Sequence, residues 1–215
     1  MKIKIVSLLL AFGLTNAAFS GNSAKVGYAS DFFYRGAQKA EESIQASVGL
    51  GSSVGGLDIS AHACTNQAVD AGVDSYHLGA GAGKSFADGL LSVYAGINHF
   101  EDKPGNALSE FQVGISSSTL LNPSLSIFRD FDDSLYTVEA GVSHGFDLDV
   151  VNLELDASIG NTDLTNSTDR TYYSVGATAS KSLSDNADLA VGVDYVDADD
   201  IDREFVFGTA LTFNF

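Results

Sequence analysis

Apolar and polar residues alternate one by one through almost the whole chain after Ser23, and this constrains the fold more than any other feature. A period of two is typical of β-strands with two unlike faces. One face carries Ile, Val, Leu and aromatic residues, and the other carries Gly, Ser, Thr and acidic residues. Twelve segments follow this pattern and none keeps a helical period, so we predict an all-β chain of twelve strands.

The lengths of these segments favour a membrane barrel over a water-soluble sandwich. They run about 9–11 residues, the length that a tilted strand needs to cross a bilayer, whereas sandwich strands average about 5–6. Connections alternate between short ones (51–56, 86–89, 117–124, 146–149, 182–186) and longer polar ones (35–43, 64–74, 100–107, 160–171, 196–203). Short turns at one end and long loops at the other characterise outer-membrane barrels. We therefore predict a transmembrane antiparallel up-and-down β-barrel over residues 21–215, with both termini at the short-turn end.

The first twenty residues have the pattern of a cleaved signal peptide. Lys2 and Lys4 precede an apolar run, and small residues follow it. The formal net charge is −17, and removal of the two lysines leaves −19. Such an acidic chain repels nucleic acid, so we expect no nucleic-acid partner. Export and a barrel together predict the bacterial outer membrane.

The C-terminal segment EFVFGTALTFNF places Leu211, Phe213 and Phe215 on one face and ends on an aromatic residue. This ending resembles the signal that the barrel-assembly machinery of Gram-negative bacteria recognises. We therefore expect that machinery, together with outer-membrane lipid and lipopolysaccharide, as partners.

The polar face predicts the character of the lumen. Barrels of about eight strands are filled by side chains and those of about 16–18 leave a channel, so twelve lies between. Small inward residues leave space, and no long insertion is available as a plug, which predicts a narrow water-filled lumen; alternatively, the glycines serve strand curvature. Rings of Asp and Glu favour cations, so we expect weak cation selectivity. The candidate pore-lining residues are Asp31, Arg35, Asp58, His62, His77, Asn98, Glu110, Glu139, Glu154, Asp156 and Asp194.

The stretch ASDFFYRGAQ carries three consecutive aromatic residues at the end of the first predicted strand. Alternation predicts that Phe32 and Tyr34 face lipid in the outer aromatic girdle, while Phe33 packs inside. Asp31 and Arg35 then face the lumen. Arg35 is expected to pair with Glu42 or Glu110.

The sequence predicts no enzyme, no cofactor and no metal site. His144 follows Ser143 near a short turn, which favours an interfacial polar residue over a lipid hydrolase. Acidic loop tips could hold divalent ions that bridge to lipopolysaccharide phosphates; these are Asp130, Asp132 and Asp133, and Asp197, Asp199, Asp200 and Asp202. The single cysteine, Cys64, cannot form an internal disulfide.

The segment SDFFYRG resembles the S-D-[aromatic]-x-[aromatic]-R-G segment that begins TorF-type porins, a family of small bacterial outer-membrane proteins. The resemblance implies an outer-membrane barrel labelled as a porin. The leading interpretation is therefore a channel for small hydrophilic solutes or ions. The alternative is a closed barrel that acts as a surface adhesin or receptor and presents acidic loops.

Overall fold

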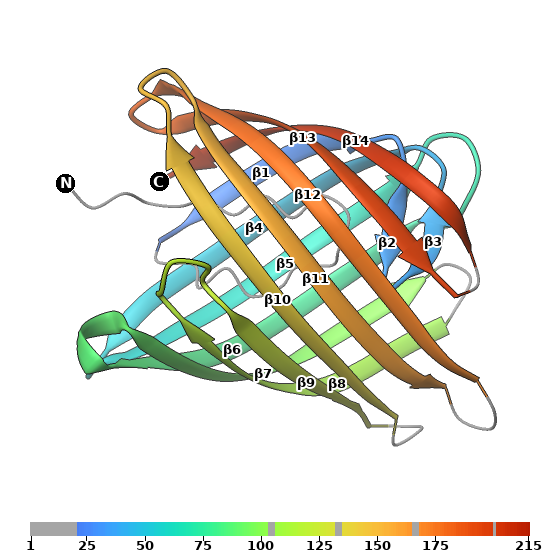
Figure 1. Cartoon of the computed structure of the whole chain (residues 1–215), viewed down its shortest axis with the longest axis horizontal. Helices are drawn as coiled ribbons and strands as arrows, with labels where there is room; N and C mark the ends of the chain where they lie inside the picture. Colours follow the sequence, from blue (N-terminus) through green and yellow to red (C-terminus); the bar gives the residue numbers. More distant parts are fainter. Residues whose placement is uncertain (1–20, 103–105, 132–134, 165–167, 200) are drawn as a thin grey trace.

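The structure, a computed structural model, describes residues 21–102, 106–131, 135–164, 168–199 and 201–215 (Figure 1). The predicted signal peptide, residues 1–20, lies outside the described residues. Within these ranges twelve strands close into one antiparallel barrel, and β2 and β3 form a separate two-stranded sheet. The barrel strands are β1 (Ser23–Ala29), β4 (Ser43–Val54), β5 (Leu57–Ala68), β6 (Ser75–Phe86), β7 (Leu91–Asp102), β8 (Asn106–Ser117), β9 (Ser124–Asp130), β10 (Tyr136–Asp147), β11 (Asn152–Leu164), β12 (Thr168–Ser184), β13 (Ala187–Ala198) and β14 (Ile201–Asn214). This confirms the predicted twelve-stranded up-and-down barrel.

The first and last strands close the wall. In the β1–β14 pair Ser23 lies opposite Asn214 and Ala29 lies opposite Gly208. Along its other side β1 pairs with β4, from Ser23 opposite Gly49 to Ala29 opposite Ser43. Closure leaves no edge strand among the described wall strands, which a bilayer requires because its core contains no water to satisfy backbone groups.

The two faces of the wall have the predicted, inverted polarity. Large apolar side chains on the outside are exposed, among them Leu50, Ile97 and Val191. Buried polar side chains such as Gln112 and Thr178 point into the barrel. This apolar outer face suits contact with lipid. Within the described chain, no helix is long and apolar enough to cross a membrane.

The first described residues and the C-terminus lie at the same end of the barrel (Figure 1), where the Phe215 amide donates to the Asn22 carbonyl at 3.1 Å. We call this end, with the turns at 55–56 and 185–186, the terminal end, and the opposite end the loop end. By the rule for outer-membrane barrels the terminal end faces the periplasm.

Three features of the strand boundaries differ from the prediction. Most strands have 12 or more residues, and β12 has 17, so the predicted long loops are largely strand. Strand pairing continues beyond the band of apolar outer residues, because segments with polar residues on both faces still form backbone hydrogen bonds with their neighbours. β1, in contrast, ends at Ala29 rather than at Tyr34. The aromatic stretch forms β2 (Phe32–Tyr34), which is not one of the wall strands.

A charged residue should distinguish the two faces of one strand. On β12, Val175 is 55% exposed on the outer face, and Ser180 points into the barrel. We expect Val175→Lys to lower the free energy of unfolding by about 2–4 kcal/mol, because the ammonium enters hydrocarbon. Ser180→Lys, the matched control, should change it little. Urea unfolding in lipid vesicles measures both; equal losses would contradict the assigned faces.

Candidate functional site: the lumen and its hairpin

A short hairpin occupies the lumen at the loop end. Its strands are β2 and β3 (Ala37–Ala40), joined by a turn at Arg35 and Gly36. We call residues 32–40 the lumen hairpin. Its side chains contact inward-facing residues of β7–β9 and β12–β14. The prediction that no long insertion is available as a plug overlooked this short hairpin: the link between the first two wall strands folds inward instead of outward.

One side of the lumen hairpin packs on apolar wall residues. Phe33 is fully buried, as predicted, in a cluster with Ala29, Tyr172, Val196, Ala198 and Val206. The turn approaches this wall closely: a Cβ added at Gly36 would lie 2.7 Å from the Tyr172 Cβ. Gly36 also has a φ of 72°, in the left-handed region that favours glycine. Glycine is thus required here both for the turn and for the contact.

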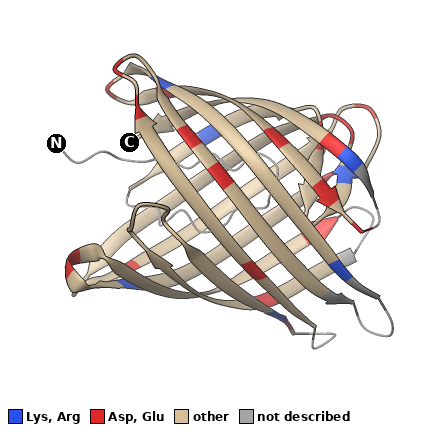
Figure 2. Ribbon diagram, viewed as in Figure 1, with Lys and Arg blue, Asp and Glu red and all other residues tan. Residues whose placement is uncertain are grey.

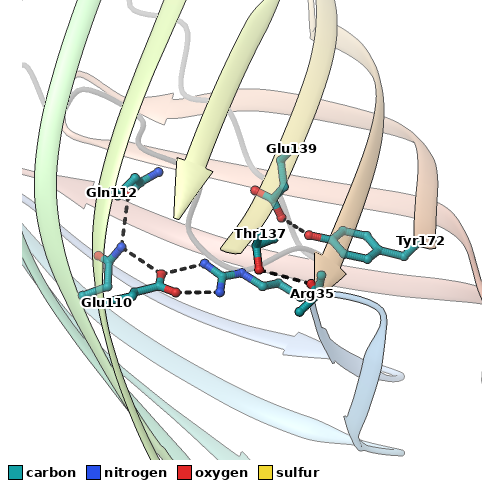
Figure 3. A network of polar contacts seen from close by, with 8 residues as sticks. Arg35, Glu110, Gln112, Thr137, Glu139 and Tyr172 are labelled. Atoms are coloured by element: carbon teal, nitrogen blue, oxygen red, sulfur yellow. Dashed lines mark hydrogen bonds and ion pairs between the residues drawn. The ribbon is translucent and has the colours of Figure 1, made fainter. Parts of the chain in front are cut away.

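The other side is held by charge. The Arg35 guanidinium donates two hydrogen bonds of 2.6 Å to the two carboxylate oxygens of Glu110 on β8. Figure 3 shows this fork, with Glu139 and Tyr172 beyond Arg35. The guanidinium also lies 4.1 Å from the ring centre of Phe128. Of the two partners predicted for Arg35, Glu110 is correct, and the bidentate geometry is the strongest available to this pair.

Two further contacts attach the lumen hairpin to β7. The Tyr34 ring stacks on Phe100 with centroids 4.4 Å apart and planes 6° apart. The Lys39 ammonium lies 2.9 Å from the Asp102 carboxylate. Tyr34 therefore faces the lumen wall, and its predicted place in the lipid-facing girdle is wrong; burial raises the pKa of its phenol, so the ring stays neutral. Tyr34, Lys39 and Asp102 were not predicted as site residues.

A polar network runs along the wall below the lumen hairpin. The Asn98 amide donates to Glu110 at 3.3 Å and to Gln112 at 3.1 Å. Gln112 in turn donates to the Tyr94 hydroxyl at 3.4 Å. Tyr94 and Ser126 hydroxyls are 2.5 Å apart. Glu110 thus belongs to both the network and the ion pair, so the wall holds the acceptor of Arg35 in place.

Several inward glycines do not open the lumen, contrary to the prediction. The ring of Tyr94 lies over Gly114 on the next strand, and the ring of Tyr172 lies over Gly160, each in the space a Cβ would need. These glycines allow a large ring to lie flat on the wall. The space that these glycines leave in the lumen is therefore partly filled by the large side chains beside them.

The structure brings together His62 and His77, two of the predicted pore-lining residues. Their rings, on β5 and β6, are 4.8 Å apart in an edge-to-face arrangement. Within the described residues no group of three or more His, Cys, Asp and Glu side chains could hold a metal ion.

Acidic residues line the far wall, on β10–β13. Glu139 accepts a hydrogen bond from the Tyr172 hydroxyl. Farther from the lumen hairpin, Asp156 and Asp194 lie opposite Gly176 on either side, and their carboxylates converge on the space above it. Figure 2 shows that acidic positions outnumber basic ones around the barrel. None of the described ion pairs includes these three carboxyl groups, although the Arg35 guanidinium lies near enough to Glu139 to interact with it.

The remaining candidate residues lie apart. Asp31 is in the link before the lumen hairpin and accepts hydrogen bonds from Ser30 and Gln38, both at 2.9 Å, so it is not on the wall. Asp58 lies at the terminal end, bonded to Ser53. Glu154 lies on the inner face of β11, two residues from Asp156. The predicted pore-lining set is thus spread over the whole length of the lumen.

The rims hold the other predicted residues. On β14 Phe213 is exposed on the outer face and Leu211 is partly exposed there, while Phe215 follows the strand and is exposed. His144 bonds to the Leu120 carbonyl and packs edge-on against Phe146 near the terminal end. Asp197 accepts hydrogen bonds from Tyr173 and Arg203. Asp132, Asp133 and Asp200 lie outside the described residues.

Comparison with solved structures supports the architecture. The chain is similar to the KdgM porin (TM-score 0.59, 11% identity, covering 90% of this chain and 99% of that one). It is also similar to the NanC porin (0.60, 9%, 91% and 100%) and to an outer-membrane channel from Pseudomonas putida F1 (0.62, 10%, 91% and 96%). No family model and no curated protein sequence matches. The chain therefore has the fold of outer-membrane porins and channels.

A methyl group added beneath the Tyr94 ring should destabilise the barrel. Gly114→Ala would displace Tyr94 and disturb its bonds to Gln112 and Ser126. We expect the free energy of unfolding to fall by about 1–3 kcal/mol, as for other overpacked sites. Gly145→Ala is the matched control: it also faces inward, and a Cβ there meets nothing within 4 Å. An equal effect of both substitutions in urea unfolding would contradict the ring-over-glycine packing.

Proposed function

We propose that the chain is a porin-like channel of the bacterial outer membrane, through which small hydrophilic solutes or ions diffuse passively. The single observation that carries this proposal is the inverted polarity of the closed barrel. A lumen lined by hydroxyl, amide and carboxylate groups costs stability unless it meets water or polar solutes. The fold shared with porins and channels supports the same interpretation.

We further propose a weak preference for cations. Two of the basic residues in the lumen are each paired with a wall carboxylate. Arg35 pairs with Glu110 on β8, and Lys39 pairs with Asp102 on β7. The far wall keeps Glu139, Asp156 and Asp194, and Asp188 lies farther towards the terminal end, where Ser182 and Asn214 donate to it. Carboxylates at successive depths lower the energy of a permeating cation and raise that of an anion.

The charge of the lumen bears on the cargo. One similar structure is described as the KdgM porin in complex with disordered oligogalacturonate, a chain of carboxylate-bearing sugars. An acidic lumen repels such a polyanion, so we infer that this chain carries small neutral or cationic solutes instead.

The cavity left between the lumen hairpin and β8–β12 measures about 180 Å³, the volume of about six water molecules.

Several finer assignments belong to the same proposal. The chain acts without catalysis and without a cofactor, and it is related to TorF-type porins through its SDFFYRG segment. Leu211, Phe213 and Phe215 form the signal for the barrel-assembly machinery. Lipopolysaccharide surrounds the loop end.

A closed barrel that serves as a surface adhesin or receptor is the second candidate. The lumen hairpin favours it, because residues 32–40 extend across the mouth and contact walls on both sides. A closed barrel would show no conductance in any variant. A channel would conduct at least weakly with the hairpin in place.

Reversal potentials in planar bilayers under a salt gradient test the proposal. We expect the refolded protein to conduct with a cation preference, and Asp194→Asn or Asp156→Asn to reduce that preference by removing a charge from the far wall. Glu101→Gln is the matched control, because Glu101 lies on the outer face of β7, bonded to Tyr76. Anion preference in the unmodified protein, or no conductance, would contradict the proposal.

A further inference from the structure

The barrel wall is complete without the lumen hairpin. β1 and β4 pair along their whole shared length, and Ala29 and Ser43, the residues that flank the connection, lie opposite one another. Residues 32–40 pair with each other and make no ladder with the wall strands. The hairpin can therefore leave its place without breaking any backbone hydrogen bond that closes the barrel.

The contacts that hold the lumen hairpin are few and separable. Towards β7–β9 they are the Arg35–Glu110 and Lys39–Asp102 ion pairs, the stack of Tyr34 on Phe100 and the Arg35 guanidinium over the Phe128 ring. Towards β12–β14 a single large apolar side chain, Phe33, is buried. Backbone bonds join the base of the hairpin to the β5–β6 link, as from the Val73 amide to the Lys39 carbonyl at 2.9 Å. Full release of the hairpin therefore also separates its base from this link, which exposes the peptide bond after Lys39.

Two features lower the stability of the inserted position of the lumen hairpin. Arg35, at the tip, has a φ of 51°, which is strained for a residue with a side chain. On the wall beside Lys39, Asp102 is buried and one of its carboxylate oxygens has no hydrogen-bond partner in the described structure. Asn66 and His77, on the two neighbouring strands, are also buried with side-chain atoms that lack a partner there. Withdrawal of the hairpin would expose Asp102 to water and relieve the backbone strain at Arg35.

We propose that the lumen hairpin is a gate: inserted, it obstructs the loop end of the lumen, and release of its two ion pairs opens the path. The proposal rests on the channel function proposed above. Glu110 and Asp102 act as the latch on the wall, and Arg35 and Lys39 are the matching groups on the gate. The network through Asn98 and Gln112 keeps the latch carboxylate of Glu110 oriented.

Trypsin cleavage after Lys39 reports on release independently of conductance. In the inserted state Lys39 is paired and lies in the mouth of the barrel, so cleavage there should be slow. The wall variants Glu110→Gln and Asp102→Asn leave the cleavage site unchanged. We expect each to speed production of the peptide ending at Lys39 by about tenfold or more, which corresponds to a loss of about 1.4 kcal/mol in the closing equilibrium. Asp58→Asn, at the terminal end, should leave the rate unchanged.

A second pair of variants avoids the ion pairs altogether. Gly36→Ala introduces a Cβ that collides with Tyr172, which should displace the tip. Gly55→Ala is its matched control: φ is 62°, so the backbone strain is similar, but a Cβ there meets nothing within 4 Å. We expect Gly36→Ala to cleave faster and to conduct at least about twofold more than the unmodified protein, and Gly55→Ala to do neither.

The outcomes separate the two proposals. Faster cleavage with higher conductance in the Glu110, Asp102 and Gly36 variants supports the gate. Unchanged cleavage and unchanged conductance in all three would overturn the gate and leave the channel standing. Faster cleavage with no conductance in any variant would overturn the channel, and with it the gate, while the hairpin itself would still be releasable. Faster cleavage with unchanged, measurable conductance would show that the hairpin does not obstruct the path and would overturn the gate alone.

Discussion

The structure depends on the closure of one backbone ladder. In hydrocarbon every amide and carbonyl must find a partner within the protein, and twelve strands achieve this only because β1 pairs with both β4 and β14. Closure fixes which face of each strand meets lipid, since a slip of one residue would exchange the two faces. The apolar outer face and polar lumen, as well as the shared end for both termini, follow from this single requirement and from an even number of strands.

The lumen hairpin is a segment at the loop end that this requirement leaves free. Its conformation is determined by side chains: Phe33 on one wall, and Arg35 and Lys39 on the other. Polar contacts between side chains are weaker and more readily exchanged with water than a closed ladder is. Under the proposed gate, stability resides in the wall and the adjustable obstruction in the hairpin, a division that suits a membrane channel.

The sequence predicted the wall well and the lumen poorly. Period-two alternation is a local signal, so strand number, facing and closure could be read from it, and charge with parity limited the partners of Arg35 to Glu42 or Glu110. The alternation of Phe32, Phe33 and Tyr34, however, is the same in a strand that continues and in a strand that turns back. The turn residues Arg35 and Gly36 were the available signal for a hairpin. Contacts such as Tyr94 over Gly114, or Asp156 and Asp194 over Gly176, depend on register between strands, which spacing along one chain does not reveal.

The most direct measurement is single-channel conductance of a protein that lacks the lumen hairpin. Because Ala29 and Ser43 already lie opposite one another, a two-residue turn such as Asn-Gly can join β1 to β4 in place of residues 30–42. We expect a folded barrel whose conductance exceeds that of the complete protein and which retains the cation preference, since the carboxylates of the far wall remain. Conductance equal to or below that of the complete protein, in a barrel shown to be folded, would contradict it.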